Sequence, residues 1–314
     1  MSGFCATRRN DRDRDGADEK EQRMNEDDFQ EHDCDLCGSS DAIEIEVARH
    51  YTAGQPLHVC KGCGFVYVRR RRSAKRIAEM WPDDIYGEGY TARIPAVKAR
   101  QVYVAEFLDT SIGLKGKAVC DIGGGEGQFL ELIGTQEYGA KAFAIEPSPK
   151  NCKMMSAAGI ENFCGSIEDY RASPKFKGRR FDVITIMWTL ENCQSCRTMV
   201  DAAYDILKTR GHLLIATGSR ILVPFKKPMQ YYLNTNPADT HCFRFSANTL
   251  GGVFAVSGFK QTHINRYIDT DYLMAIAQRT DRSKDIPWEK DDYRQVIDFF
   301  KRWHQETQKH YKDD

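Results

Sequence analysis

The residues with the clearest chemical potential lie in a glycine-dense turn. An apolar stretch ends at Asp121 and Ile122 and runs into glycines at positions 123, 125 and 127, and a stretch of helical character follows. Glycines at such a strand-to-helix turn let the backbone bend tightly and approach a nucleotide closely. The next apolar stretch ends at Glu146, and an acid roughly twenty residues after the turn is placed to bind a ribose diol. The alternative is an ordinary tight turn with Glu146 as a surface acid.

The spacing of the glycines separates two kinds of nucleotide turn. A dinucleotide fingerprint has glycine at its first, third and sixth positions, whereas Gln128 stands at the sixth position here. The pattern acid-x-G-x-G-x-G resembles motif I of the class I S-adenosylmethionine-dependent methyltransferases. The resemblance implies that Gly123, Gly125 and Gly127 lie under the amino-acid and ribose portions of S-adenosylmethionine and that Asp121 organises the turn. It also implies that the acid at the end of the second strand takes the ribose hydroxyls.

The same resemblance places further cofactor contacts on two later loops. Residues 165–169 correspond to the segment that binds adenine, which implies contacts through Ser166 or the backbone of Ile167. An acid often follows the glycine of this segment in related proteins, so Ser166 departs from the usual pattern. Met187 and Trp188 end the fourth strand, where the chain is expected to face the cofactor and the transferred methyl group.

The loop after the fourth strand is where the resemblance places the reaction. It carries Glu191 and Asn192 where related methyltransferases often read Leu-Glu-His. Asparagine cannot act as a general base, so either another residue takes the proton or the nucleophile needs no base. His241, between the fifth strand and a late helix, is the replacement candidate for a catalytic base. The alternative is a plain loop histidine.

Four cysteines in two CxxCG pairs predict a metal site. Cys34 and Cys37 form the first pair, and Cys60 and Cys63 form the second. Four thiolates at this spacing suit tetrahedral zinc, and a closed four-cysteine site leaves no open coordination position, so the zinc would be structural. It would stabilise a module too small to hold itself together well. The alternative is four unconnected reduced thiols.

Two other motifs leave a functional and an ordinary interpretation open. Cys193 and Cys196 form a third CxxC at a helix start, a position that lowers the pKa of a thiol. No second pair completes a metal site there, so ordinary thiols are favoured. Four consecutive arginines from Arg69 to Arg72 could bind the phosphates of nucleic acid or of a nucleotide-linked substrate, or could equally form a solvated linker.

Two tyrosine pairs are candidates for lining the substrate site. Tyr86 and Tyr90 precede the helix that leads into the cofactor strand and could cap the cofactor pocket, or pack that helix onto the sheet. Tyr231 and Tyr232 could stack on a planar or sugar substrate, or belong to the core.

Composition limits the classes of function. The chain has 314 residues, and its 45 lysines and arginines balance 45 acidic residues, so no global field draws in nucleic acid or an anionic membrane. No apolar run is long enough to span a bilayer, and the charged N-terminus carries no apolar signal core. Eleven cysteines, several in apparent core strands, suggest a reducing compartment, and the cytoplasm is the simplest location. The sequence does not indicate an oligomeric state.

Alternating apolar strands and helices predict an α/β fold with a mostly parallel sheet covered on both faces. By resemblance it is the Rossmann-like seven-stranded methyltransferase sheet, whose last strand is antiparallel. Four units are expected: a disordered charged tail at 1–30, a zinc ribbon at 31–80, the methyltransferase domain at 81–280 and a C-terminal helix at 281–314.

A zinc ribbon followed by a tyrosine-rich segment and motif I resembles the bacterial methyltransferases of sugar and surface-polysaccharide biosynthesis. The resemblance implies methyl transfer from S-adenosylmethionine to a small polar acceptor, such as a sugar or nucleotide-linked sugar. Only a short charged helix is expected where the sugar C-methyltransferases have an extended C-terminal domain, so O- or N-methylation is at least as plausible. Two alternatives remain open, namely an RNA- or tRNA-directed methyltransferase that uses the ribbon and the arginine run, and a non-catalytic S-adenosylmethionine-binding protein.

Overall fold

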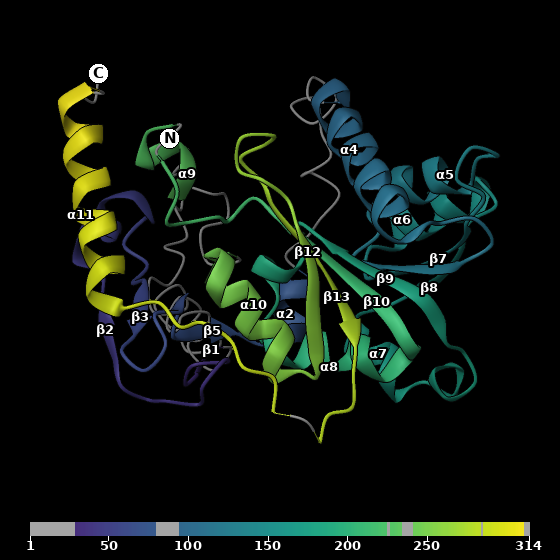
Figure 1. The fold of residues 1–314 in the computed structure, drawn as a ribbon, viewed down its shortest axis with the longest axis horizontal. Helices are drawn as coiled ribbons and strands as arrows, with labels where there is room; N and C mark the ends of the chain where they lie inside the picture. The colour runs from purple at the N-terminus through teal and green to yellow at the C-terminus, as the bar shows by residue number, and fades with distance from the viewer. Residues whose placement is uncertain (1–28, 80–93, 225–226, 234–240, 284, 311–314) are drawn as a thin grey trace, which may run out of the picture.

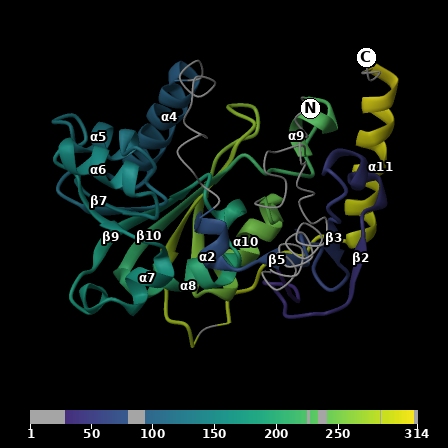
Figure 2. The same ribbon diagram turned by 180° about the vertical axis from the view of Figure 1, so that it is seen from behind.

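The computed structural model describes residues 29–79, 94–224, 227–233, 241–283 and 285–310. Its centre is a seven-stranded sheet, which Figures 1 and 2 show from opposite sides. The strands run in the order β12 (Phe259–Ile264), β13 (Leu273–Arg279), β10 (Leu207–Thr217), β9 (Phe181–Met187), β6 (Ala118–Ile122), β7 (Lys141–Glu146) and β8 (Glu161–Cys164). Strand β13 is antiparallel to both of its neighbours, and β10, β9, β6, β7 and β8 pair in parallel. The predicted fold class, with its antiparallel last strand, is confirmed.

Helices cover both faces of this sheet (Figure 1). Three of them, α4 (Ile94–Ile112), α5 (Gln128–Gly134) and α6 (Pro149–Ala157), bury apolar side chains against one face. The opposite face is covered by α7 (Ile167–Ala172), α8 (Cys196–Ile206) and α10 (Ala247–Val256). Because both faces are covered, the central strand β9 is apolar and almost wholly buried along its length. None of the described helices is long and apolar enough to cross a membrane.

A second, four-stranded sheet is built around the cysteine pairs. Its order is β11 (Phe243–Arg244), β4 (Val66–Tyr67), β3 (His58–Cys60) and β2 (Ala42–Glu44). Strand β11 comes from the part of the chain expected to form the methyltransferase domain, yet it pairs with β4 of the ribbon. Three of the four ribbon cysteines, Cys34, Cys60 and Cys63, also lie in the same hydrophobic cluster as Leu190, Phe245 and Leu250. The ribbon therefore shares a sheet and a core with the larger unit.

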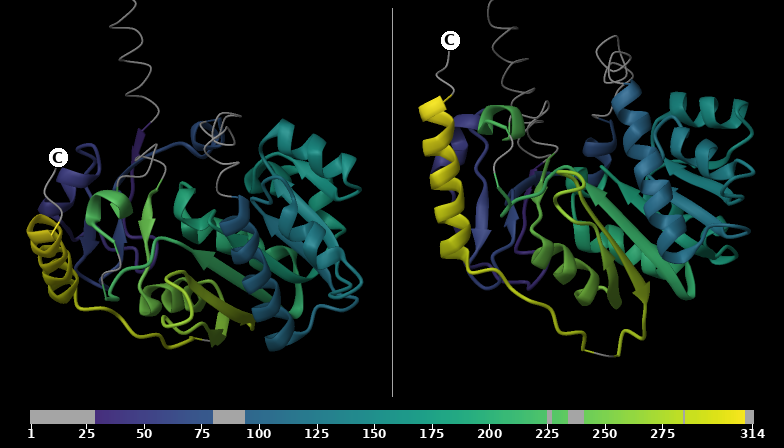
Figure 3. Two further views of the ribbon diagram at one scale, coloured as in Figure 1. Left: turned by 90° about the horizontal axis from the view of Figure 1, so that it is seen from above. Right: turned by 45° about the horizontal axis from the view of Figure 1, so that its top comes forward.

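Shorter elements complete the ribbon and its surroundings. Strand β1 (Phe29–Glu31) pairs with β5 (Arg70–Arg72), and α2 (Ala74–Glu79) follows directly. The C-terminal helix α11 (Tyr293–His310) lies beside β3, the 3-10 helix η1 (Glu46–Tyr51) and α9 (Met229–Leu233), as the two views of Figure 3 also show. The apolar face of α11 is buried there, at Val296, Phe299, Phe300 and Trp303.

Three local sequence patterns predict elements that the structure forms differently. A glycine after a helical stretch is typical of a helix C-cap, yet Gly211 lies inside β10, because α8 already ends at Ile206 and the positive φ of 62° falls on Arg210. The apolar residues within 43–47 favour one strand, but the segment is divided between β2 and η1. Val102 fits the apolar spacing of the helix at 94–108, yet it is 39% exposed. Tyr86 and Tyr90 lie outside the described residues.

Candidate functional site

A cavity of about 310 Å³ opens at the carboxyl ends of β6, β7 and β9. In parallel α/β sheets, ligands bind at this edge because the loops that leave the strands converge there. Most of the cofactor residues expected from the sequence line the cavity: Asp121, Gly123, Gly125, Glu146, Ser166, Ile167, Met187 and Trp188, together with Asn192. The structure therefore brings together residues that are spread over more than seventy positions of the chain.

The glycine turn has the backbone that only glycine adopts easily. The φ angles of Gly123, Gly125 and Gly127 are 80°, 56° and 85°, in the left-handed region that side chains disfavour. A Cβ on Gly123 would stand 2.3 Å from the Thr189 hydroxyl oxygen, and one on Gly127 would stand 2.5 Å from a Met155 carbon. Gly123 and Gly125 line the cavity, whereas Gly127 does not and instead precedes α5 as its N-cap residue.

Glu146 is held in place by the turn it is expected to assist. One carboxylate oxygen accepts the Gly125 N–H at 2.9 Å, and the other accepts the Ser148 N–H at 2.9 Å and an Asn151 amide hydrogen at 3.4 Å. The side chain is buried, and burial raises the pKa of its carboxyl above the ordinary value. Each carboxylate oxygen has two lone pairs, so a carboxylate fixed in this way can still accept ribose hydroxyls from the cavity.

Asp121 is the most deeply buried acid of the cavity wall. It is 2% exposed, and one oxygen accepts the Thr185 hydroxyl at 2.7 Å. Burial raises the pKa of this carboxyl from 3.8 to about 7, and the nearby Glu146 charge acts in the same direction. A cationic ligand in the cavity would favour the ionised form of Asp121.

The segment expected to bind adenine begins helix α7. Ser166 is the N-cap, and its side chain forms a capping box with Asp169, with bonds of 2.9–3.1 Å. The Gly165 N–H bonds the Glu146 carbonyl oxygen at 2.9 Å, which fixes the segment to the end of β7. Ser166 and Ile167 both line the cavity, so adenine contacts by either residue stay a prediction.

Trp188 and Asn192 form the wall of the cavity after β9. Trp188 has a φ of 52°, which is strained for a residue with a bulky side chain. Its backbone N–H donates to the Ala216 carbonyl oxygen at 2.7 Å. The Asn192 side chain donates to the Trp188 carbonyl oxygen at 2.9 Å and so closes the turn. Asn192 therefore shapes this wall, at the place where the sequence expects the methyl group.

Glu191 and His241 lie outside the set of cavity-lining residues. Glu191 is 2% exposed, and its side chain accepts the Gly218 N–H at 3.3 Å. Burial and the Arg244 charge lower the pKa of His241 to about 3, so the imidazole is neutral at pH 7 and a weak base. Within the described part of the chain, the lining residues include no histidine.

Arg100 is a cavity residue that no sequence pattern predicts. It reaches the cavity from α4, and its guanidinium lies over the Trp188 ring at 4.2 Å and near the Tyr272 ring at 5.3 Å. It is the one basic side chain among the described lining residues, and no described carboxylate forms an ion pair with it. On a helix with mixed surface residues, one arginine carries no signal that distinguishes it from a solvated charge.

The two CxxCG pairs come together as predicted. The sulfurs of Cys34, Cys37, Cys60 and Cys63 all lie within 4.8 Å of one another, with Cys34–Cys63 at 3.5 Å and Cys37–Cys60 at 3.4 Å. A tetrahedron of sulfurs at zinc distance has edges of ~3.8 Å, so the donor set fits a four-thiolate metal ion. The glycines after each pair have positive φ, and their N–H groups bond the carbonyl oxygens of Cys34 and Cys60 at 2.8 Å.

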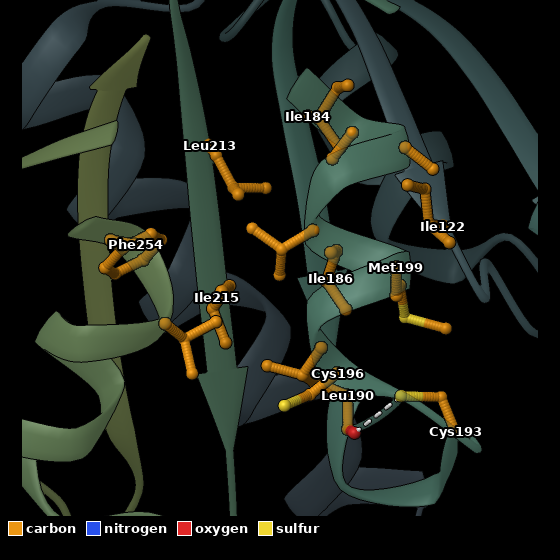
Figure 4. Close-up of a cluster of buried hydrophobic side chains, with 14 of the residues drawn as sticks. Ile122, Ile184, Ile186, Leu190, Cys193, Cys196, Met199, Leu213, Ile215 and Phe254 are labelled. Atoms are coloured by element: carbon orange, nitrogen blue, oxygen red, sulfur yellow. Dashed lines mark hydrogen bonds between the residues drawn. The ribbon is translucent and has the colours of Figure 1, made fainter. Parts of the chain in front are cut away.

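The third CxxC is a pair of ordinary buried thiols. Cys193 and Cys196 pack among aliphatic side chains, and the Cys193 thiol donates to the Leu190 carbonyl oxygen at 3.2 Å (Figure 4). Burial raises the pKa of both thiols well above the ordinary value. The described residues contain one cluster with metal-ligand spacing, the four ribbon cysteines.

The arginine run does not present four free charges. The Arg71 side chain is fully buried and forms an ion pair with Asp35 at 2.7 Å. Arg69 pairs with Glu31 at 3.1 Å, and the guanidinium groups of Arg70 and Arg72 lie over the Phe29 ring. Arg71 therefore cannot contact a phosphate, and it does not belong to the predicted nucleic-acid-binding surface.

The strand order and the glycine–acid cavity define a class I methyltransferase fold. Independent comparison agrees, because the model of a family described as a methyltransferase domain matches residues 96–264. The match covers more than half of the chain, and the chain belongs to this family.

Individual relatives are more distant. The chain is 29% identical over 147 residues to the ubiquinone biosynthesis O-methyltransferase of Xylella fastidiosa (strain 9a5c), a match that covers 44% of the chain and 58% of that relative's length. The corresponding protein of Cupriavidus pinatubonensis is 25% identical over 191 residues, or 54% of the chain and 76% of the relative. A Burkholderia thailandensis 1,6-didemethyltoxoflavin-N1-methyltransferase structure superposes with a TM-score of 0.52 at 16% identity, over 69% and 96% of the two chains, and this shows a shared fold.

Proposed function

We propose that the protein transfers the methyl group of S-adenosylmethionine to a hydroxyl of a small organic acceptor. One observation supports this most strongly: the Glu146 carboxylate is anchored to the Gly125 N–H at the wall of a cavity at the strand ends. This combination supplies a ribose acceptor and a close backbone approach in one place.

The charges around the cavity fit the cofactor. Asp121 offers a carboxylate to the cationic parts of S-adenosylmethionine, and Arg100 offers a guanidinium to its carboxylate. The sulfonium already activates the methyl group, so the residues need to align donor and acceptor for an in-line displacement. The cavity places Trp188 and Asn192 at the β9 side, where they can position the acceptor.

The acceptor is proposed to be a hydroxyl compound for two reasons. The ubiquinone-biosynthesis relatives are O-methyltransferases by name, and the combination of ribbon and motif I resembles sugar methyltransferases. The names of the relatives favour an oxygen nucleophile, and the resemblance to sugar methyltransferases allows one. A sugar hydroxyl and a phenolic hydroxyl are the two forms to test. The described lining residues include no histidine, and water is proposed to take the acceptor proton.

The four-cysteine cluster is proposed to hold a structural zinc ion. Four thiolates complete the tetrahedral shell, so the site supplies folding energy and no open position for a substrate. Elemental analysis of the purified protein should find one zinc per chain.

Labelled S-adenosylmethionine tests the activity. The protein is incubated with the labelled cofactor and either nucleotide-linked sugars or polyhydroxylated aromatics, and products are sought as acceptors heavier by one methylene. Transfer to either class supports the proposal and identifies the acceptor chemistry. Failure of the wild type to bind S-adenosylhomocysteine at all would contradict the proposed function. Salt-dependent RNA binding with methyl transfer to RNA would instead favour the RNA-directed alternative.

A further inference from the structure

A buried ion pair links the cysteine cluster to the wall of the cavity. Arg71, on β5, donates from Nη2 to the Asp35 carboxylate at 2.7 Å, and both side chains are shielded from solvent. The guanidinium also lies over the rings of Phe243 at 4.8 Å and Tyr67 at 5.7 Å. The carboxylate and the two rings contact the guanidinium from three sides and fix its position.

Asp35 is fixed by the cysteines on either side of it. It stands between Cys34 and Cys37 in the first CxxCG pair. Its second oxygen accepts the Ser195 hydroxyl at 2.7 Å, and Ser195 is the N-cap residue of α8. One carboxylate therefore joins the metal-binding turn to the start of a helix of the large unit.

Arg71 extends the link to the cavity itself. Its Nη1 donates to the carbonyl oxygen of Gln194, and Gln194 lines the cavity together with Asn192 and Cys193. Ala74 and Ile77, on the helix α2 that follows β5, line the cavity as well. The segment that begins at Arg71 thus carries part of one cavity wall and is bonded to another.

A second, backbone route runs in the same direction. The Val68 N–H bonds the Cys242 carbonyl oxygen at 2.8 Å, and the Cys242 N–H bonds the Glu191 carbonyl oxygen at 2.7 Å. The residue that follows strand β4 of the ribbon is in this way connected to the turn that follows β9. Two separate sets of bonds therefore end on residues 191–195.

We propose that Asp35 and Arg71 are positioning residues that couple metal binding at the cysteine cluster to cofactor binding in the cavity. Loss of the metal would release the Cys34–Cys37 turn and with it the Asp35 carboxylate. A buried arginine without its partner is strongly unfavourable, so Arg71 would leave Gln194 and the wall at 192–194 would shift. This inference rests on the proposed function, because it assumes that the cavity binds S-adenosylmethionine.

Thermodynamic linkage makes the coupling measurable from both sides. If metal raises the affinity for the cofactor, the cofactor must raise the affinity for the metal by the same factor. Couplings of this kind are typically 5- to 150-fold. The expected result for the wild type is a loss of S-adenosylhomocysteine affinity of roughly tenfold or more on zinc removal, and an equal rise in zinc affinity, read by equilibrium competition with a chelator, when S-adenosylhomocysteine is saturating.

The experiment combines titration calorimetry with equilibrium zinc competition against a chelator on the full chain. Arg71→Met should bind S-adenosylhomocysteine weakly even when zinc-loaded, and its zinc affinity should be the same with and without S-adenosylhomocysteine. Arg70→Met is the matched control on the same strand, because Arg70 is exposed and contacts the Phe29 ring alone among the described rings. It should behave as the wild type.

Asp35→Asn provides a milder variant that keeps the shape and an oxygen acceptor, in case Arg71→Met does not fold. It should reduce the effect of S-adenosylhomocysteine on zinc affinity. A zinc affinity of the wild type that is unchanged by saturating S-adenosylhomocysteine would overturn the coupling without any variant. A zinc-loaded wild type that does not bind S-adenosylhomocysteine would instead overturn the proposed function.

Discussion

Replacing Asp121 with asparagine is expected to stabilise the fold at alkaline pH. The wild-type carboxyl is 2% exposed, and burial raises its pKa from 3.8 to about 7. An acid with a raised folded-state pKa binds its proton more tightly when folded, so stability falls as pH rises from 3.8 to about 7. Ionisation of Asp121 lowers the free energy of unfolding by about 4 kcal/mol above pH 7, and this loss shrinks toward zero near pH 4.

Asparagine at position 121 removes only part of the free-energy cost of burying an ionised carboxylate. Its oxygen can still accept the Thr185 hydroxyl, which lies 2.7 Å from the aspartate oxygen. Its amide group adds a buried donor, and an unsatisfied donor costs about 1–3 kcal/mol. The net gain for Asp121→Asn is therefore about 1–3 kcal/mol at pH 8, and it should become a loss near pH 4.

Denaturant unfolding measures the difference in unfolding free energy between the wild type and Asp121→Asn. It is carried out at about pH 4.5 and about pH 8, near the two ends of the titration. Asp298→Asn, on the exposed side of α11, is the control and should show no comparable change with pH. Because Asp121 lines the cavity, the same variant should bind S-adenosylmethionine more weakly despite its greater stability. A stability difference between Asp121→Asn and the wild type that stays constant with pH would refute the reasoning.

Four further outcomes follow from the site. Glu146→Gln should weaken S-adenosylhomocysteine binding by about 2–4 kcal/mol in calorimetry, because charge-assisted bonds to the ribose are lost; an unchanged Kd would contradict this. Gly127→Ala should lower stability by about 2–4 kcal/mol in denaturant unfolding, since its Cβ would meet Met155 and its φ is 85°; a Tm equal to that of the wild type would count against it. Cys60→Ser should abolish stoichiometric zinc and lower the Tm, whereas a wild type without bound metal would argue against the zinc site. His241→Ala should keep most of the turnover, since His241 does not line the cavity; a kcat loss above about 100-fold would restore it as the base.

The sequence predicts the cofactor half of the site well because local chemistry determines it. A turn with three glycines at positive φ and an acid at the next strand end must meet at the same sheet edge, whatever the rest of the chain does. The cysteine cluster is predictable for the same reason, because its two pairs have the spacing of metal ligands. These features need no knowledge of long-range packing.

The remaining features depend on contacts between distant segments. Arg100 becomes a cavity residue only because α4 crosses the sheet edge beside Trp188. Arg71 appears as one charge in a basic run, and its burial follows from pairing with Asp35 and from the ring of Phe243, which lies far along the chain. His241 stands near the expected place in sequence, yet the pairing of β11 with β4 turns that segment toward the ribbon.

The central claim is that an S-adenosylmethionine ribose binds against Glu146 above the glycine turn. A crystal structure with S-adenosylhomocysteine tests it through the distance between the ribose oxygens and the Glu146 carboxylate. We expect at least one oxygen–oxygen distance of about 2.6–3.0 Å, with the ligand inside the cavity at the ends of β6 and β7. A ligand bound elsewhere, or a ribose that faces away from Glu146, would contradict the account.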